Sequence, residues 1–227
     1  MNNTAIQTQT GLSSFYAKIY GFVAMGIGLS TFVSGLMLTV FQNHLVNMIT
    51  GSPWRLYLII FAELGLVLFA SRAAIKNTPM ALPLFLIYSL VNGYTLSFII
   101  ARYTQTTVFQ ALLSATVMFA VMAIIGVTVK KDLSGIGKAL MGALIGIIIA
   151  SVVNVFIGSG AMSYVISIVT VLIFAGLIAW DNQRIKQVYF ELDGQVPTGW
   201  AVSLALNLYL DFINLFIHLL NILSRND

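Results

Sequence analysis

A polar stripe runs along the last apolar segment of the chain, residues 199–222. At 100° per residue its six members fall within an arc of about 80° on one helical face: Ser203, Asn207, Asp211, Asn214, His218 and Asn221. Because unsatisfied polar groups are costly in hydrocarbon, this face must look into protein or water. We therefore expect this helix at the centre of the fold and expect Asp211 to be functional, since a carboxylate at membrane depth usually is.

Two other carboxyl groups and one cation are candidate partners of Asp211. Glu63 lies well inside the apolar segment 54–75, Arg72 stands near the end of that segment, and Asp181 closes the segment 161–181. Two carboxylates a few ångströms apart in a poorly hydrated site cannot both ionise cheaply, so they share a proton. An arginine that approaches one of them favours its charged form, which would couple the position of a gate to pH.

Calcium is an ion that such a site could take. It prefers about six to eight oxygen ligands, so Asp181 and Asp211 with amide carbonyls and water would bind it weakly. Weak binding suits permeation, because the ion must leave again. On this interpretation the two aspartates are transient metal ligands, and Glu63, Asn207 and Asn214 line the ion route.

Each of these residues also has a plainer interpretation. The Asn and Ser side chains could join helices by hydrogen bonds, and Glu63 could be a protonated side chain bonded to a neighbouring helix. Asp181 could form a solvated surface pair with Arg184, one turn further on. His218 is expected to be a packing or interfacial residue, because no second His or Cys lies near enough to complete a metal site.

The composition requires a membrane protein. The chain is 59% hydrophobic and 8% charged over 227 residues, which leaves too little polar surface for a soluble domain. Stretches of about 20 apolar residues predict seven transmembrane helices, near 19–41, 54–75, 80–101, 107–129, 136–157, 161–181 and 199–222. We expect one all-α membrane domain over residues 19–223, with tails at 1–18 and 224–227. The absence of cysteine excludes disulfides, thiolate metal sites and cysteine nucleophiles.

The distribution of basic residues predicts the orientation. Eight of the 11 Lys and Arg side chains fall on the side shared by the N-terminus and the even-numbered loops, and three fall on the other side. The positive-inside rule then places the N-terminus in the cytoplasm and, after seven crossings, the C-terminus outside a cell membrane. If the last segment only dips into the membrane and returns, the C-terminus would be inside.

Two stretches, "FAGLIAWDNQRIKQVY" at 174–189 and "ALNLYLDFINLFIHLL" at 205–220, resemble the signature stretches of the transmembrane Bax inhibitor motif family, or Bax inhibitor-1-like proteins. The resemblance extends over the whole chain in length, helix number and loop pattern. It implies a seven-helix fold in which the other six helices surround the last one. The short N-terminus resembles that of prokaryotic members.

The resemblance also implies roles for individual residues. Asp181 and Asp211 match a paired-aspartate pH sensor in a calcium leak pathway, in which a basic residue near the end of the second helix holds the helix-six aspartate closed. That residue falls where this chain has Ala74, so Arg72 is the expected latch and Lys76 the alternative. The implied function is a pH-sensitive calcium leak channel, with calcium and protons as its ionic partners.

Three other functions compete with a channel. A proton-coupled cation exchanger would use the same residues, and a non-transporting regulator of a membrane protease or stress response would need none of them. An intramembrane aspartyl protease is disfavoured, because "LYLD" around Asp211 lacks the Gly-x-Gly-Asp pattern. We therefore expect no enzymatic activity, no cofactor and no nucleic-acid partner, and the sequence identifies no protein partner.

The orientation gives the first testable prediction. On this cysteine-free chain, Lys131→Cys should react with an impermeant thiol reagent only from the cytoplasmic side, and Asn226→Cys only from the outside, because the distribution of charges demands it. Labelling of right-side-out and inside-out vesicles measures both. Labelling of Asn226→Cys from the inside alone would contradict the seven-crossing orientation.

Overall fold

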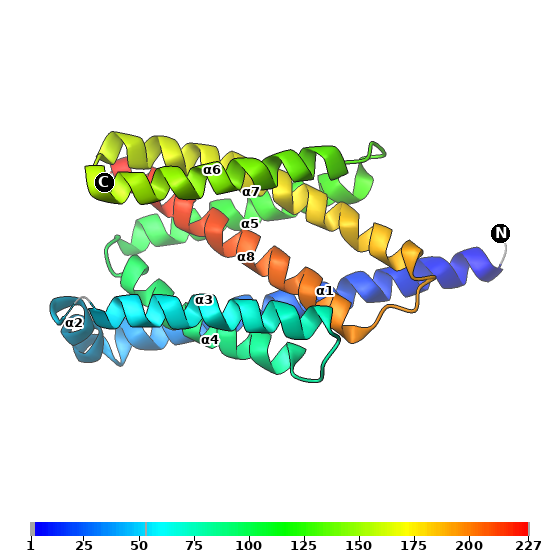
Figure 1. The fold of residues 1–227 in the computed structure, drawn as a ribbon, viewed down its shortest axis with the longest axis horizontal. Coiled ribbons are helices and arrows are strands. Elements are labelled where there is room, and N and C mark those ends of the chain that lie inside the picture. Colours follow the sequence, from blue (N-terminus) through cyan, green and yellow to red (C-terminus); the bar gives the residue numbers. More distant parts are fainter. Residues whose placement is uncertain (1–2, 53, 227) are drawn as a thin grey trace. The chain divides into compact units, whose positions relative to one another are not determined.

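The structure, a computed structural model, describes the backbone of residues 3–52 and 54–226 and the side chains of residues 9–52 and 54–225. Residues 1, 2 and 227 of the two predicted tails lie outside the described residues. The described chain is helical, with no strand. Its helices are α1 (Asn3–Thr39), α2 (Gln42–Thr50), α3 (Trp54–Ile75), α4 (Ala81–Ile100), α5 (Gln105–Thr128), α6 (Ser134–Ile157), α7 (Gly160–Glu191) and α8 (Thr198–Leu223) (Figure 1).

Seven of the described helices are long and apolar enough to cross a membrane, namely all except α2. The predicted all-α fold with seven spans is therefore confirmed. The helix α3 has the predicted bounds, and α4, α5, α6 and α8 begin and end within two residues of theirs. Length and mean hydropathy were sufficient for these five because most connections carry turn residues that stop the helix and Thr104 caps the start of α5.

The bounds of the first and sixth predicted helices were wrong. α1 begins at Asn3, not at residue 19, and α7 continues to Glu191, not to residue 181. At about 1.5 Å per residue both helices are longer than the roughly 30 Å of a hydrocarbon core. The two extensions support each other, because the Tyr189 ring packs on Phe15 at 5.9 Å between centroids and its hydroxyl fills the space beside Gly11. Hydropathy marks only the part of a helix that lipid covers.

The sequence did not predict the short helix α2. It follows α1 directly and buries Leu45 in a cluster with Met37 and Phe98. His44 adds a polar contact, since its Nε2 lies 3.0 Å from the Tyr94 hydroxyl of α4. Nine residues, with four apolar side chains of which the fold buries only Leu45, are too short a pattern to distinguish this helix from a loop.

The chain divides into two compact units, of which the first combines residues 1–102 with 188–209. It contains α1 to α4, the end of α7 and the first half of α8. The helix α4 packs against both α1 and α3. The approach to α1 is very close at Gly93, where a Cβ would collide with the backbone of Ser30. Ser34 Oγ donates to Gly93 O at 2.7 Å beside it.

The second unit combines residues 103–187 with 210–227, and so contains α5, α6, most of α7 and the second half of α8. Glycines hold α7 against both neighbours. A Cβ at Gly126 of α5 would collide with the carbonyl of Ala179, and the Trp180 ring occupies the space where Gly137 of α6 would carry a Cβ. Two helices therefore fix α7 in the turn just before Asp181.

The last span, α8, is one uninterrupted helix of 26 residues that is long and apolar enough to cross a membrane, and the side on which the C-terminus lies stays a prediction. In the first unit it contacts α1 and α4 through Tyr209 and the end of α3 through Gly199. In the second unit it contacts α5 through Phe212, packs on α7 through His218, and shares a cavity with α6.

The most apolar stretch of α8 is 67% buried, against 44% or less in each of the others. This burial is what a helix enclosed by its neighbours within each unit requires.

The contact at Gly126 gives a stability prediction. Gly126→Ala should lower the unfolding free energy by about 1–3 kcal/mol, because the new methyl group forces α5 away from Ala179. The matched control is Gly146→Ala on α6, where a Cβ meets open space and a better helix former should be neutral or stabilising. Thermal unfolding in detergent measures both. Equal effects of the two substitutions would show that helix propensity, and not the close approach, decides.

Candidate functional site

Asp181 lies inside α7, not at its end. Its side chain is only 5% exposed, although the pattern that follows it, "NQRIKQ", is polar. The helix continues because Ile185 and Val188 carry the buried face onward and no Gly or Pro occurs before Gly194. Asp181 is therefore a buried carboxyl group, which contradicts the alternative of a solvated surface pair.

A glutamine beside Asp181 fixes the loop between α5 and α6. Gln183 Oε1 accepts a hydrogen bond from Leu133 N at 2.8 Å, and its Nε2 donates to Lys131 O at 2.9 Å and to Val129 O at 3.3 Å. One buried amide therefore satisfies three backbone groups of residues 129–133. The role of Gln183 could not be predicted from the sequence, because an amide in a polar run has no periodic signal.

Asp211 is buried as well, at 6% exposure, and lies in the same unit as Asp181. The two carboxyl groups are close enough for a hydrogen bond between their side chains. Asp181 Oδ1 and Asp211 Oδ2 are nevertheless buried without a hydrogen-bond partner among the described residues. A carboxyl–carboxyl contact needs a proton as its donor, so the arrangement suits a pair that holds one proton between two groups.

No basic side chain among the described residues is found in direct contact with this pair. Arg184 attracts the Asp181 charge, but its guanidinium lies over the Trp180 ring at 5.8 Å from the centroid. Arg72 lies in the last turn of α3, and Lys76 follows that helix; both are exposed. Neither Arg72 nor Lys76 makes an ion pair that can be found in the described part of the chain.

Glu63 is bonded to a neighbouring helix, as one of the two interpretations expected. Its Oε1 accepts from Asn92 Nδ2 at 2.5 Å and its Oε2 contacts Thr95 Oγ1 at 2.7 Å. Thr95 has one hydroxyl hydrogen, and Val91 O lies within 3.0 Å of it as a second acceptor. The contact therefore fits either an ionised Glu63 that accepts from Thr95 or a protonated Glu63 that donates to it.

The Glu63 contacts continue across the first unit to α8 and α1. The Tyr209 hydroxyl donates to Asn92 Oδ1 at 2.7 Å and lies 2.6 Å from Ser30 Oγ. Ser30 is also within 2.7 Å of Ser89 O. This chain of polar contacts joins α3, α4, α8 and α1, and its member on α8, Tyr209, lies two residues before Asp211.

The two predicted asparagines behave differently. Asn214 Nδ2 donates to Leu210 O on its own helix at 2.8 Å. Asn207 is partly exposed and makes no hydrogen bond found among the described residues. Along α8 most apolar side chains are buried, whereas five of the six stripe residues keep partial exposure, all except Asp211. The polar stripe is therefore the least covered face of an otherwise buried helix.

Comparison with known proteins identifies relatives over the full length. A family model described as "Inhibitor of apoptosis-promoting Bax1" matches residues 12–227. A membrane protein of Streptococcus pyogenes serotype M1 is 59% identical over 100% of both chains. The protein YrjE of Lactococcus lactis is 41% identical over 95% of this chain and 92% of its own, and the inner membrane protein YbhL of Escherichia coli K12 is 34% identical over 99% and 97%.

The contacts of Glu63 give a prediction that separates its charge from its hydrogen bonds. Glu63→Gln should change the unfolding free energy by less than about 1 kcal/mol, because the amide keeps an oxygen for Asn92 and offers an N–H to Thr95. Glu63→Ala should cost about 1–3 kcal/mol, because it leaves both partners unsatisfied. Chemical or thermal unfolding in detergent measures the difference.

The matched control is Glu191→Ala, which removes an exposed carboxylate at the end of α7 and should have little effect. A loss in Glu63→Gln as large as that in Glu63→Ala would show that the negative charge itself holds the network together.

Proposed function

Because the chain belongs to the Bax inhibitor-1-like family of multi-pass membrane proteins, we propose that it is a pH-sensitive calcium leak channel. The observation that carries the proposal is the buried Asp181–Asp211 pair, with two carboxyl oxygens that have no partner in the described residues. Such oxygens have two natural occupants, a proton and a cation. Competition between them is what a proton-controlled calcium pathway needs.

The proton side of the proposal follows from charge. With one proton the pair carries a single negative charge and makes its own hydrogen bond. Loss of that proton leaves two negative charges in a poorly hydrated site, which is unfavourable unless a cation arrives. The pair therefore exchanges a proton for a calcium ion or for a basic side chain.

The basic side chain in this proposal is Arg72, with Lys76 as the alternative. Pairing of Asp181 with Arg72 would favour its charged form without calcium and so hold a closed state. The glycine contacts that fix α7 support this role, because a rigidly held Asp181 gives the latch a defined target.

The calcium side of the proposal requires weak binding. In the described part of the chain no three His, Cys, Asp or Glu side chains converge as metal ligands. The pair therefore supplies at most two carboxylates, with water and amide oxygens for the remainder. We assign the ion route to the uncovered polar face of α8, including Asn207 and Asn214, with Glu63 as a further contributor.

The proposed location is the cell membrane, with the N-terminus in the cytoplasm and the C-terminus outside, for the charge reasons given above. In this orientation calcium would leak into the cell through the protein, across the lipid bilayer. Protons would act on the pair from the cytoplasmic half. Calcium and protons are the partners that the function requires.

Calcium flux through the purified protein in liposomes tests the function. We expect flux down a calcium gradient with no counter-ion requirement, and a dependence on pH that belongs to the pair. Asp181→Asn and Asp211→Asn should each flatten that dependence, and the double variant should add little, because coupled residues are non-additive by about 0.5–3 kcal/mol. Arg72→Ala should raise flux at a pH where the unchanged chain is closed.

Asp132→Asn is the matched control for the loss of a carboxylate. Asp132 lies outside the spans, and hydrogen bonds from Ser134 hold the pKa of this carboxyl below its usual range. It stays ionised near neutral pH, so its removal should leave the pH profile unchanged. Independent, additive effects of the two Asn substitutions would contradict the paired sensor. A strict requirement for a proton gradient would indicate an exchanger, and no flux at all would indicate a regulator.

A further inference from the structure

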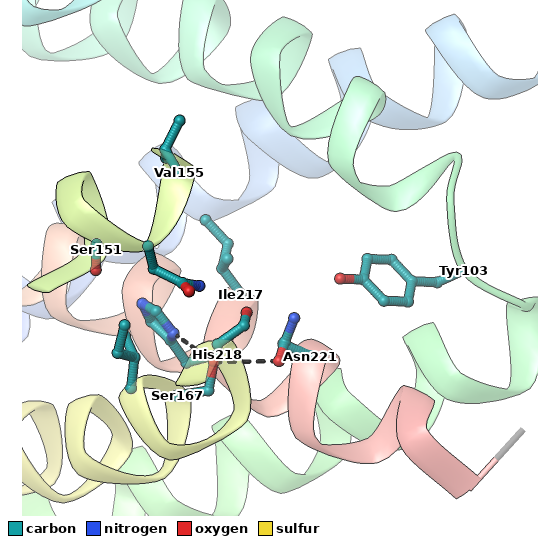
Figure 2. Close-up of a pocket in the computed structure, with 10 residues that line it drawn as sticks. Tyr103, Ser151, Val155, Ser167, Ile217, His218 and Asn221 are labelled. Carbon is teal, nitrogen blue, oxygen red and sulfur yellow. Dashed lines mark hydrogen bonds between the residues drawn. The ribbon is translucent and has the colours of Figure 1, made fainter. Parts of the chain in front are cut away.

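A cavity of about 250 Å³ lies in the second unit, among α6, α7, α8 and the residue Tyr103 that precedes α5 (Figure 2). Its lining combines apolar surface with polar, uncharged side chains among the described residues, and the polar ones that matter here are Ser151, Asn154, Ser167, His218 and Asn221. At about 30 Å³ per water molecule it has room for roughly eight waters. This volume is enough for a cation that keeps its first shell of water.

The hydrogen bonds in the cavity wall define the state of His218. Ser167 Oγ donates to Asn221 Oδ1 at 3.3 Å, so its one hydrogen is used (Figure 2). His218 Nδ1 lies 3.1 Å from the same hydroxyl and must therefore be the donor to it. A neutral imidazole protonated at Nδ1 carries its lone pair on Nε2. No hydrogen bond to Nε2 is found in the described part of the chain, so this lone pair is available to an occupant.

The cavity lies at the end of the polar stripe on α8. His218 follows Asp211 by seven residues, which is about two turns or roughly 10 Å along the helix, on the same face. In the proposed orientation this end of α8 is extracytoplasmic. The cavity is therefore placed to receive an ion from outside before it reaches the aspartate pair.

The charge of the cavity depends on His218. Among the described residues its titratable lining groups are His218 and Tyr103, and the side chains that α6 and α7 present to it are neutral. Arg225, which follows α8, is held over the Tyr164 ring at 4.6 Å from the centroid and is not a lining residue. A proton on Nε2 would thus turn a neutral chamber into a positive one.

We infer that this cavity is an extracytoplasmic binding vestibule for a hydrated cation, and that the neutral imidazole of His218 keeps it accessible to cations while a protonated one excludes them. The waters around the ion donate hydrogen bonds to neutral hydroxyl and amide oxygens and to the Nε2 lone pair. Because no carboxylate is found among the described lining residues to replace these waters, the ion keeps its hydration shell. This inference rests on the proposed function for the ion route beyond the cavity. Its test measures rates of thiol modification and not calcium flux.

The experiment uses Ser151→Cys, a conservative change in the cavity wall of a chain without cysteine. Proteoliposomes are treated from outside with a cationic trimethylammonium methanethiosulfonate and, separately, with an anionic sulfonate methanethiosulfonate. Both reagents react with the thiolate, so the ratio of their rates cancels its titration and reports the charge of the cavity. We expect a ratio that favours the cation near pH 8 and falls about tenfold only at the acidic pH, towards about pH 3, at which the buried imidazole gains its proton, as one charge appears within several ångströms.

His218→Asn in the same background should abolish this fall, because the amide keeps a donor for Ser167 and cannot gain a charge. His218→Gln is a second variant in case the first does not fold. Ser52→Cys in the exposed loop between α2 and α3 gives the intrinsic ratio of the reagents. Millimolar calcium should slow modification at Ser151→Cys and leave Ser52→Cys unchanged.

Three results would overturn the inference: no modification of Ser151→Cys by either reagent, a ratio independent of pH, or the same pH dependence without His218. Each would leave the cluster of Ser167, His218 and Asn221 as a contact that joins α7 to α8. If the ratio of modification rates favours the cation and depends on His218 but the protein shows no calcium flux, the proposed function is wrong and the inferred vestibule still holds.

Discussion

The structure depends on one constraint, the absence of water from the hydrocarbon core, which obliges the polar groups of α8 to find partners within the protein. Tyr209 meets this need with Asn92 and Ser30, and Asn214 with a carbonyl of its own helix. His218 and Asn221 meet it at Ser167. Within each unit the neighbouring helices contribute partners to α8 because a helix with this stripe cannot face lipid.

Close helix contacts at two glycines, together with the hydrogen bonds of Gln183, hold the framework around the aspartate pair. Gly126 and Gly137 bring α5 and α6 against α7, and Gln183 ties down the loop between them. Glycine at these positions allows helices to approach closely, which replaces the hydrophobic effect as the source of packing in a membrane. Asp181 is therefore fixed, so a change of state at the pair must arise from its protons, from Asp211 or from an approaching cation.

Sequence pattern predicted the spans and the helical face of the stripe, because lipid and helical geometry impose both directly. It failed where water or a specific partner decides. The last turns of α7 lie beyond the apolar run, yet they are helical because Tyr189 packs on α1. The buried state of Asp181, the amide bonds of Gln183 and the partners of Glu63 depend on which side chains meet in space, and residue types along one chain do not specify that. Asp181 and Asp211 were brought together as the two signature stretches implied, while their roles stay proposals.

The carboxyl groups inside the protein differ in one physical respect that separates their functions. Both oxygens of Glu63 have polar partners, so an ionised Glu63 is already compensated and gains little from an additional cation. Asp181 and Asp211 each leave one buried oxygen without a partner among the described residues, and no cation contacts them there. An uncompensated buried carboxylate has a strong tendency to bind a proton or a metal ion. The response to pH and calcium is therefore assigned to the aspartate pair. The role assigned to Glu63 is structural: its contacts hold α3, α4 and α8 together.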